Sequence, residues 1–166
     1  MNLLTVLFAV VAAVRIKVRR ENNNKPIGLP YASSTYNYNP SFVPPFKGRK
    51  LGGMLIRAQN STGNGNNPFD VGPSVITFAA RQDRFVFGPS HIVLTSHDAS
   101  DNFGVEDPRV AWDSNGTFYL LYSAVEQNST AVTSRLALAT STTPDVASSW
   151  QRKGPLFDFW SKSGSP

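Results

Sequence analysis

Hydrophobic and polar positions along this chain alternate over short distances and rarely follow the spacing of a helix. From residue 36 onward, apolar and aromatic runs of about four to nine residues are separated by Gly, Pro, Asn, Asp and Ser, which favour turns. No stretch of roughly ten or more residues after the N-terminal segment carries helical periodicity. We expect strands at 36–43, 52–60, 74–81, 85–88, 91–95, 108–112, 117–125 and 134–142, and then a polar loop at 143–157 that ends on a buried Trp150 and a short strand.

This pattern predicts an all-β fold. The strands at 108–112 and 117–125 flank Asp-Ser-Asn-Gly at 113–116, which is typical of a hairpin turn. A sandwich, a barrel and a propeller all use short strands with regular turns, so the pattern alone leaves the three open. The strands at 52–60, 117–125 and 134–142 each lead toward a polar residue or a turn, which suits the inner strands of propeller blades around a central site.

The first 24 residues have a different character. Residues 2–14 are apolar and uncharged, and the basic run Arg-Ile-Lys-Val-Arg-Arg follows at 15–20. An apolar stretch of about 13 residues is short for a membrane span and has the length of a signal-peptide core. We predict a signal peptide or signal anchor with a basic flank at 1–24 and a linker at 25–35. The alternatives are a buried first strand or a misassigned start of the coding sequence.

Three Asn-X-Ser/Thr sequences add support for entry into the secretory pathway. They predict N-glycosylation at Asn60, Asn115 and Asn128. Asn115 falls in the expected hairpin turn, where a glycan is tolerated. We therefore expect a secreted protein, or a membrane-anchored one if the leader is retained.

Composition narrows the function classes. The chain has 166 residues with 40% hydrophobic content, which suits one globular domain with a core. Its formal charge of +5 comes mainly from clusters near the N-terminus and at 47–50, so no broad basic face for nucleic acid is expected. The absence of cysteine excludes disulfides and zinc–thiolate sites, and His91 and His97 are too few for most metal sites.

One short segment combines acidic and basic residues in a chain that is only 16% charged. Glu106, Asp107 and Arg109 stand within four positions, just before the expected hairpin. A solvated turn explains such a cluster, and from spacing alone that interpretation is favoured. A sugar-cleaving site also requires a carboxyl group and an arginine on a rigid edge, so the rest of the chain has to decide.

Motifs elsewhere in the chain bear on this choice. Over about residues 36–157, five segments resemble glycoside hydrolase family 130 in order and spacing. They are YNPSFVPP, GGMLIRAQN, GVEDPRVAW, FYLLYSAV and RLALATSTTPDVASSWQRKGPLF. That family contains β-mannoside phosphorylases and mannosidases. The resemblance implies a five-bladed β-propeller, of which 36–166 would form the N-terminal part with about two to three blades. An open propeller would leave edge strands that favour self-association.

The resemblance also implies roles for individual residues. Asp107 matches the general acid, which in this family reaches the leaving oxygen through a sugar hydroxyl, and Asn39 and Arg57 match positions that hold the mannosyl unit. Glu106 and Arg109 flank the acid, and Arg109 would pair with one of the two carboxylates and orient it. Phosphate ligands are mostly expected outside this chain, with Arg135 a weak candidate.

The expected function is cleavage of β-mannosidic bonds in a mannose-containing oligosaccharide, with inversion and with Asp107 as the acid. Inorganic phosphate would be the co-substrate of a phosphorylase, and no cofactor or metal is expected. The sequence separates neither phosphorolysis from hydrolysis nor one linkage from another. The alternatives are a non-catalytic, secreted propeller fragment that binds glycans or assembles with other chains, and an all-β structural domain with no role in sugar chemistry.

Overall fold

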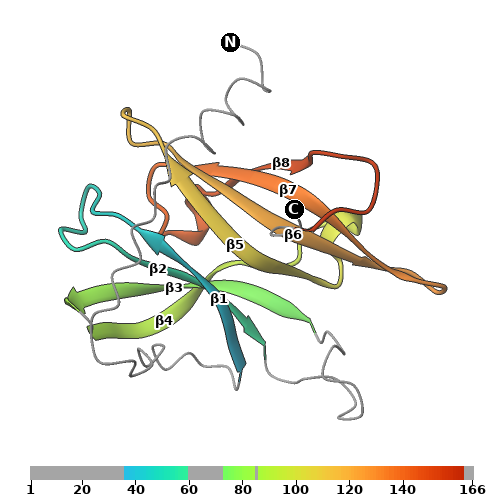
Figure 1. The fold of residues 1–166 in the computed structure, drawn as a ribbon, viewed down its shortest axis with the longest axis horizontal. Helices are drawn as coiled ribbons and strands as arrows, with labels where there is room; N and C mark the ends of the chain where they lie inside the picture. The colour runs from blue at the N-terminus through green and yellow to red at the C-terminus, as the bar shows by residue number, and fades with distance from the viewer. Residues whose placement is uncertain (1–35, 60–72, 85, 163–166) are drawn as a thin grey trace.

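The structure, a computed structural model, describes residues 36–59, 73–84 and 86–162. Almost all of their regular structure is β-strand, which confirms the all-β prediction (Figure 1). The elements are β1 (Tyr36–Val43), β2 (Gly53–Gln59), β3 (Ser74–Asp83), β4 (Val86–Leu94), η1 (Ala99–Asp101), β5 (Gly104–Trp112), β6 (Phe118–Gln127), β7 (Val132–Ser141), η2 (Ala147–Ser149) and β8 (Gln151–Pro155).

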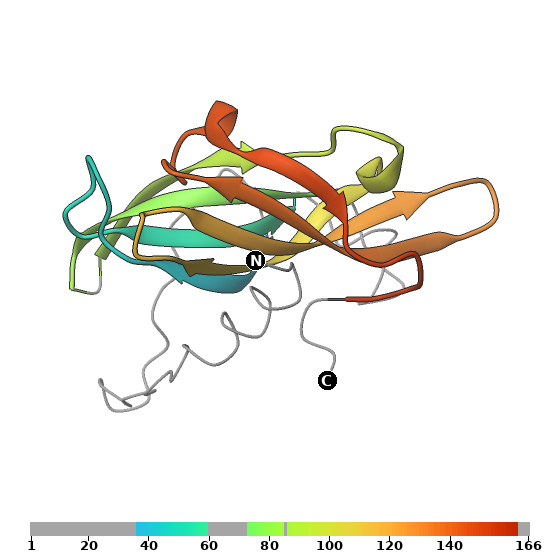
Figure 2. The ribbon, with the colours of Figure 1, turned by 90° about the horizontal axis from the view of Figure 1, so that it is seen from above.

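The strands form two similar units. In the first, β1, β2, β3 and β4 pair antiparallel in chain order, and in the second β5, β6, β7 and β8 do the same. A single parallel pair, Ser74 with Gly104, joins β3 to β5 and links both units into one sheet. The view from above shows the strands of both units in a twisted array (Figure 2). Four-stranded antiparallel units of this kind are the blades of a β-propeller. The sheet is not closed, so the number of blades stays a prediction.

One hydrophobic core runs through both units. The first half of β6 buries alternate residues, whereas β2, β3 and the first half of β5 are buried over successive residues and so are covered on both faces. Phe46 follows β1 and packs edge-on against Phe78 of the first unit and Phe118 of the second, with ring centroids 6.2 and 5.6 Å apart. The fully or nearly fully buried side chains include Val43, Leu55, Ile76, Phe78, Val105, Phe118, Leu120 and Tyr122.

The same bulge interrupts the first strand of each unit. The register of β1 on β2 shifts between Tyr38 and Ser41, and the register of β5 on β6 shifts between Glu106 and Arg109. Two residues of the bulged strand therefore lie opposite one residue of its partner. The two residues are Asn39-Pro40 in the first unit and Asp107-Pro108 in the second.

Backbone strain accompanies both bulges. Asn39 has φ 46° and Asp107 has φ 50°, and among the described residues only these two have positive φ without being glycine. A following proline normally restricts a residue to extended conformations, which adds to the cost at both positions. Such strain persists only where surrounding packing holds it, and it is common at functional sites.

The predicted hairpin at 113–116 is confirmed. The Oδ1 atom of Asp113 accepts hydrogen bonds from the backbone N–H of Asn115 at 2.9 Å and of Thr117 at 3.0 Å, and the hydroxyl of Tyr119 donates to Oδ2 at 2.9 Å. These bonds favour the ionised carboxylate, so they hold the pKa of Asp113 below its usual value, with the bond from Thr117 contributing most. Asn115 and Asn128 lie in exposed turns, and glycosylation of both stays a prediction.

Two strand predictions were wrong in detail. Residues 85–88 and 91–95 were expected as two strands, but β4 runs through from Val86 to Leu94 with irregular register. Pro89 is tolerated there because β4 pairs only with β3 and its outer edge needs no donor. The strand expected at 108–112 begins earlier, because 104–107 is the buried first half of β5 and not a solvated turn.

Several predictions fall outside the described residues. They are the leader at 1–24, the linker at 25–35 and the glycosylation of Asn60. In the part of the chain that the structure describes, no helix has the length and apolar character to cross a membrane.

Candidate active site

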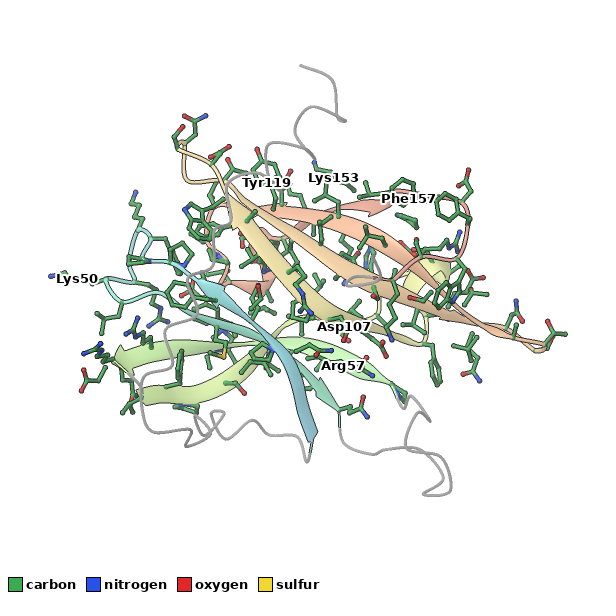
Figure 3. All side chains as sticks on the ribbon, in the orientation of Figure 1. Lys50, Arg57, Asp107, Tyr119, Lys153 and Phe157 are labelled. Atoms are coloured by element: carbon green, nitrogen blue, oxygen red, sulfur yellow. The ribbon has the colours of Figure 1, made fainter. Side chains whose placement is uncertain are left out.

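Arg57 lies between two buried carboxylates. Its Nη2 is 2.8 Å from Oε1 of Glu106, and its Nη1 is 3.3 Å from Oδ1 of Asp107 (Figure 3). Nη2 also donates to Oε1 of Gln59 at 3.1 Å. Arg57 comes from β2 of the first unit and both acids come from β5 of the second, so the cluster is built across the junction between the units.

The bulge in β5 explains why two successive acids reach one arginine. In a regular strand, Glu106 and Asp107 would point to opposite faces of the sheet. The positive φ of Asp107 and the register shift after Glu106 break this alternation. Both carboxylates therefore turn toward Arg57, and both are almost completely buried.

The amide of Asn39 adds a second donor to Asp107. Its Nδ2 donates to Oδ1 of Asp107, the same oxygen that faces Arg57. The two bulges thus place an amide and a carboxylate against each other. A further bond, from the N–H of Val110 to Oγ of Ser41 at 3.0 Å, ties β5 to β1 beside them. The structure therefore brings together three residues that the sequence singled out: Asn39, Arg57 and Asp107.

Lys162 is a member of this cluster that the sequence reasoning missed. Its Nζ is 3.1 Å from Oε2 of Glu106 and 3.8 Å from Oδ2 of Asp107. Ser74 completes the surroundings of Glu106, with its Oγ donating to Oε1 at 3.4 Å. Arg57 and Lys162 together balance the two negative charges, which is the usual condition for keeping ionised carboxylates buried.

Lys162 reaches the site because the segment after β8 is fastened to β7. The N–H of Leu156 donates to the carbonyl of Leu136 at 2.8 Å, and the N–H of Ser161 donates to the carbonyl of Ser134 at 2.9 Å. The Oγ of Ser161 in turn accepts from the N–H of Leu136 at 2.9 Å. These bonds position residue 162 beside β5. The only sequence signal was a lone basic residue in a non-periodic segment, which does not predict such a contact.

Two predicted site residues do not join the cluster. The pairing expected of Arg109 with Glu106 or Asp107 is wrong, because Arg109 is exposed and donates from Nη1 to the carbonyl of Pro108 at 2.8 Å. Arg57 takes that place instead. Arg135, the weak phosphate candidate, forms an ion pair with Glu126 on the neighbouring strand β6.

The arrangement supports polyol recognition. An amide, a guanidinium and an ammonium provide directed donors, and two carboxylates provide acceptors; all but the ammonium of Lys162 are held on strands. Sugar hydroxyls need both kinds of partner. A carboxyl group fixed by a strained backbone and two donors is also suited to act as an acid at one defined position. Within the described residues, no group of three or more His, Cys, Asp or Glu is arranged to hold a metal ion.

Solved structures of glycoside hydrolases share this fold. A protein from Parabacteroides distasonis described as a candidate glycoside hydrolase superposes with a TM-score of 0.55 at 24% identity, and the match covers 74% of this chain and 33% of that one. A glycosyl hydrolase from Bacteroides ovatus gives 0.53 at 24% identity, with 73% and 32% covered. A third structure comes from work on the GH130 family of mannoside phosphorylases, which contains hydrolases that target β-1,2 mannosidic linkages in Candida mannan. It superposes with a TM-score of 0.52 at 23% identity, and the match covers 73% of this chain and 32% of that one.

At these identities the comparisons establish the fold, which is one that glycoside hydrolases use. The chain spans about a third of the length of each of these structures. No family model matches the sequence, and no curated protein matches it.

Proposed function

We propose that this chain carries the sugar-binding and acid-bearing part of a site that cleaves β-mannosidic bonds with inversion. The observation that carries the proposal is the convergence of Asn39 and Arg57 on one oxygen of Asp107, at a strained bulge between the two units. The motifs shared with family 130 and the fold shared with glycoside hydrolases support it.

In this proposal each residue has a distinct task. Asp107 supplies the proton that the leaving oxygen receives as the glycosidic C–O bond breaks, and a sugar hydroxyl relays it. Asn39 and Arg57 hold hydroxyls of the mannosyl unit and keep the Asp107 carboxyl in one orientation. Glu106 accepts from a further hydroxyl, and Lys162 compensates its charge. Water or inorganic phosphate attacks the anomeric carbon from the opposite face.

The test is turnover of β-1,2-mannobiose by the full chain, with and without phosphate. Free mannose alone indicates hydrolysis, and mannose 1-phosphate indicates phosphorolysis. Asp107→Asn should lower the rate by about 10²–10⁴-fold, as expected for loss of a general acid. Asp158→Asn, which changes an exposed acid outside the cluster, should leave the rate unchanged. Equal turnover by the wild type and Asp107→Asn would overturn the assignment of the acid.

Binding of mannosides without turnover is the second candidate function. It is favoured by the ion pair of Arg135 with Glu126, which leaves the weak phosphate candidate engaged elsewhere. Calorimetry with methyl β-mannoside separates the two functions. Binding that is weakened by Arg57→Met, in a chain that releases neither product, would support the binding function. Loss of both binding and turnover in a folded chain would contradict both.

A further inference from the structure

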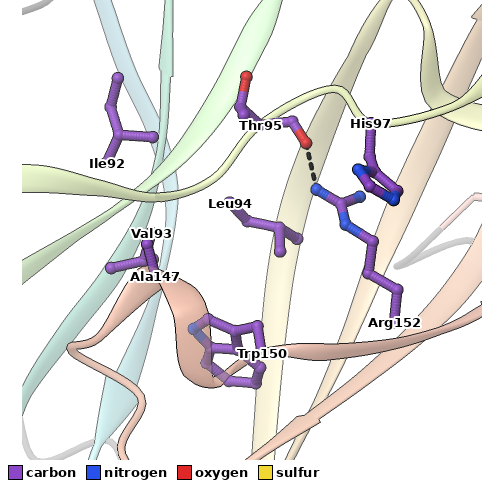
Figure 4. Close-up of a pocket in the computed structure, with 8 residues that line it drawn as sticks. All are labelled: Ile92, Val93, Leu94, Thr95, His97, Ala147, Trp150 and Arg152. Atoms are coloured by element: carbon purple, nitrogen blue, oxygen red, sulfur yellow. Dashed lines mark hydrogen bonds between the residues drawn. The ribbon is translucent and has the colours of Figure 1, made fainter.

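A pocket of about 430 Å³ lies between the edge strand of the first unit and the end of the second (Figure 4). The last residues of β4 form one side, and η2 with the start of β8 forms the other. None of the residues that line it belongs to the cluster around Arg57 and Asp107. It is therefore a separate site, and the two described units build it together.

One wall of the pocket is apolar and fixed. Trp150 lines it and is only 8% exposed, and its indole N–H donates to the carbonyl of Pro144 at 3.2 Å. Leu94 is buried in the same wall, whereas Ile92 at its other end is 50% exposed. A bound molecule would therefore meet a preformed apolar surface, and little side-chain entropy would be lost on binding.

The opposite end of the pocket is polar and equally rigid. Arg152 donates to the carbonyl of Thr95 (Figure 4). It also forms an ion pair with the buried carboxylate of Asp101 and donates to the hydroxyl of Tyr122 at 3.5 Å. Asp101 also accepts from the backbone N–H of His97 at 2.7 Å. These described bonds use three of the five N–H donors of the guanidinium, which leaves donors for a ligand.

The charge in the pocket is already balanced. Asp101 is 1% exposed and neutralises Arg152, so the site offers directed hydrogen bonds without a net positive field. An anion would gain little over a neutral polar molecule here. The imidazole of His97, exposed at the same end, provides one donor and one acceptor when neutral.

We propose that this pocket is an auxiliary binding site for a neutral pyranose. A sugar ring has an apolar face of C–H groups and a rim of hydroxyls, which match the wall at Trp150 and Leu94 and the donors of Arg152 and His97. The volume falls within the roughly 300–1,000 Å³ of small-molecule sites. The proposal goes beyond the function assigned to the Asp107 cluster, because this site would hold a glycan without reacting with it.

The test is an NMR titration of the full ¹⁵N-labelled chain with methyl β-mannoside and, separately, with sodium phosphate. Ala147→Trp fills the pocket from η2, and Ser148→Trp places the same indole on the exposed neighbour that does not line it. We expect saturable shifts at His97 and at the Trp150 indole with the sugar in the wild type and in Ser148→Trp. Ala147→Trp should weaken this binding at least tenfold.

Two further measurements distinguish the proposed sugar pocket from the function proposed for the Asp107 cluster. Asp107→Asn should leave the shifts at His97 and Trp150 unchanged, even if it abolishes turnover. A loss of turnover without any effect on these shifts therefore bears only on the Asp107 site. Absence of sugar-induced shifts at the pocket, equal affinity in Ala147→Trp, or a response to phosphate alone would overturn the proposal of a neutral sugar site.

Discussion

Replacing Arg57 by methionine tests whether the charge balance at the unit junction is essential for stability. The side chains of Arg57, Glu106 and Asp107 are 11%, 2% and 7% exposed, so the change leaves two desolvated carboxylates with Lys162 as their remaining cation. Removing one partner of a buried ion pair costs about 3–5 kcal/mol. Because Lys162 compensates part of the charge, we expect a loss of about 3 kcal/mol, which lowers the urea midpoint by roughly 1–3 M.

A second substitution makes this prediction sharper. Arg57→Met combined with Glu106→Gln removes one negative charge and leaves Asp107 to pair with Lys162. The double variant should therefore be more stable than Arg57→Met alone, by at least about 1 kcal/mol, although it carries two core substitutions. Simple additivity would instead make it less stable than either single variant.

The matched control for the arginine is Arg109→Met. Arg109 is exposed and bonds only to the carbonyl of Pro108 among the described residues, so its replacement should cost less than about 0.5 kcal/mol. Equilibrium urea unfolding followed by tryptophan fluorescence measures the wild type, the single variants Arg57→Met, Glu106→Gln and Arg109→Met, and the double variant. A loss below about 1 kcal/mol in Arg57→Met, or a double variant with additive losses, would refute the argument from uncompensated buried charge.

Three further predictions concern the scaffold. Gly104 has φ 146°, and a Cβ there would lie 2.8 Å from a backbone nitrogen of β3. Gly104→Ala should therefore lower the free energy of unfolding, measured by thermal unfolding, by about 1–3 kcal/mol. The control Gly116→Ala should cost less, because φ is 80° there but no atom lies within 4 Å. The lowered pKa of Asp113 means that the ionised form stabilises the fold above the unfolded-state pKa and that this contribution disappears as pH falls through the folded-state pKa. The stability gap between the wild type and Asp113→Asn at pH 7 should therefore shrink in urea titrations below about pH 4, and a gap independent of pH would count against it. Expression in a secretory eukaryotic host should add glycans at the exposed Asn115 and Asn128, seen as mass loss on endoglycosidase treatment, and an unmodified secreted chain would contradict this.

Local pattern predicted most strands because short apolar and aromatic runs are separated by residues that favour turns. It failed where tertiary context decides, as at β4, whose proline is tolerated only because the strand lies at an edge. Arg57 and Asp107 were found through motifs, but their contact depends on a bulge that periodicity cannot show. Lys162 was missed because hydrogen bonds to β7 bring its segment to the site. Arg109 was misplaced because nearness in sequence was taken as nearness in space.

The repeated bulge gives a physical reason for the position of the candidate site. Both units place a polar residue followed by proline at the same point of their first strand, and packing of the two units brings Asn39 of one against Asp107 of the other. Asn39 of the first unit donates the hydrogen bond that Asp107 of the second unit accepts, so the two strained residues are hydrogen-bonded to each other. The second unit alone could not keep Asp107, which is 5% exposed, buried without a penalty. The strain and the buried charges lower the stability of the fold, and the core shared through Phe46 offsets that cost. A site at this junction is therefore rigid because two independent backbones define it, which is the condition for holding an acid in one orientation toward a sugar.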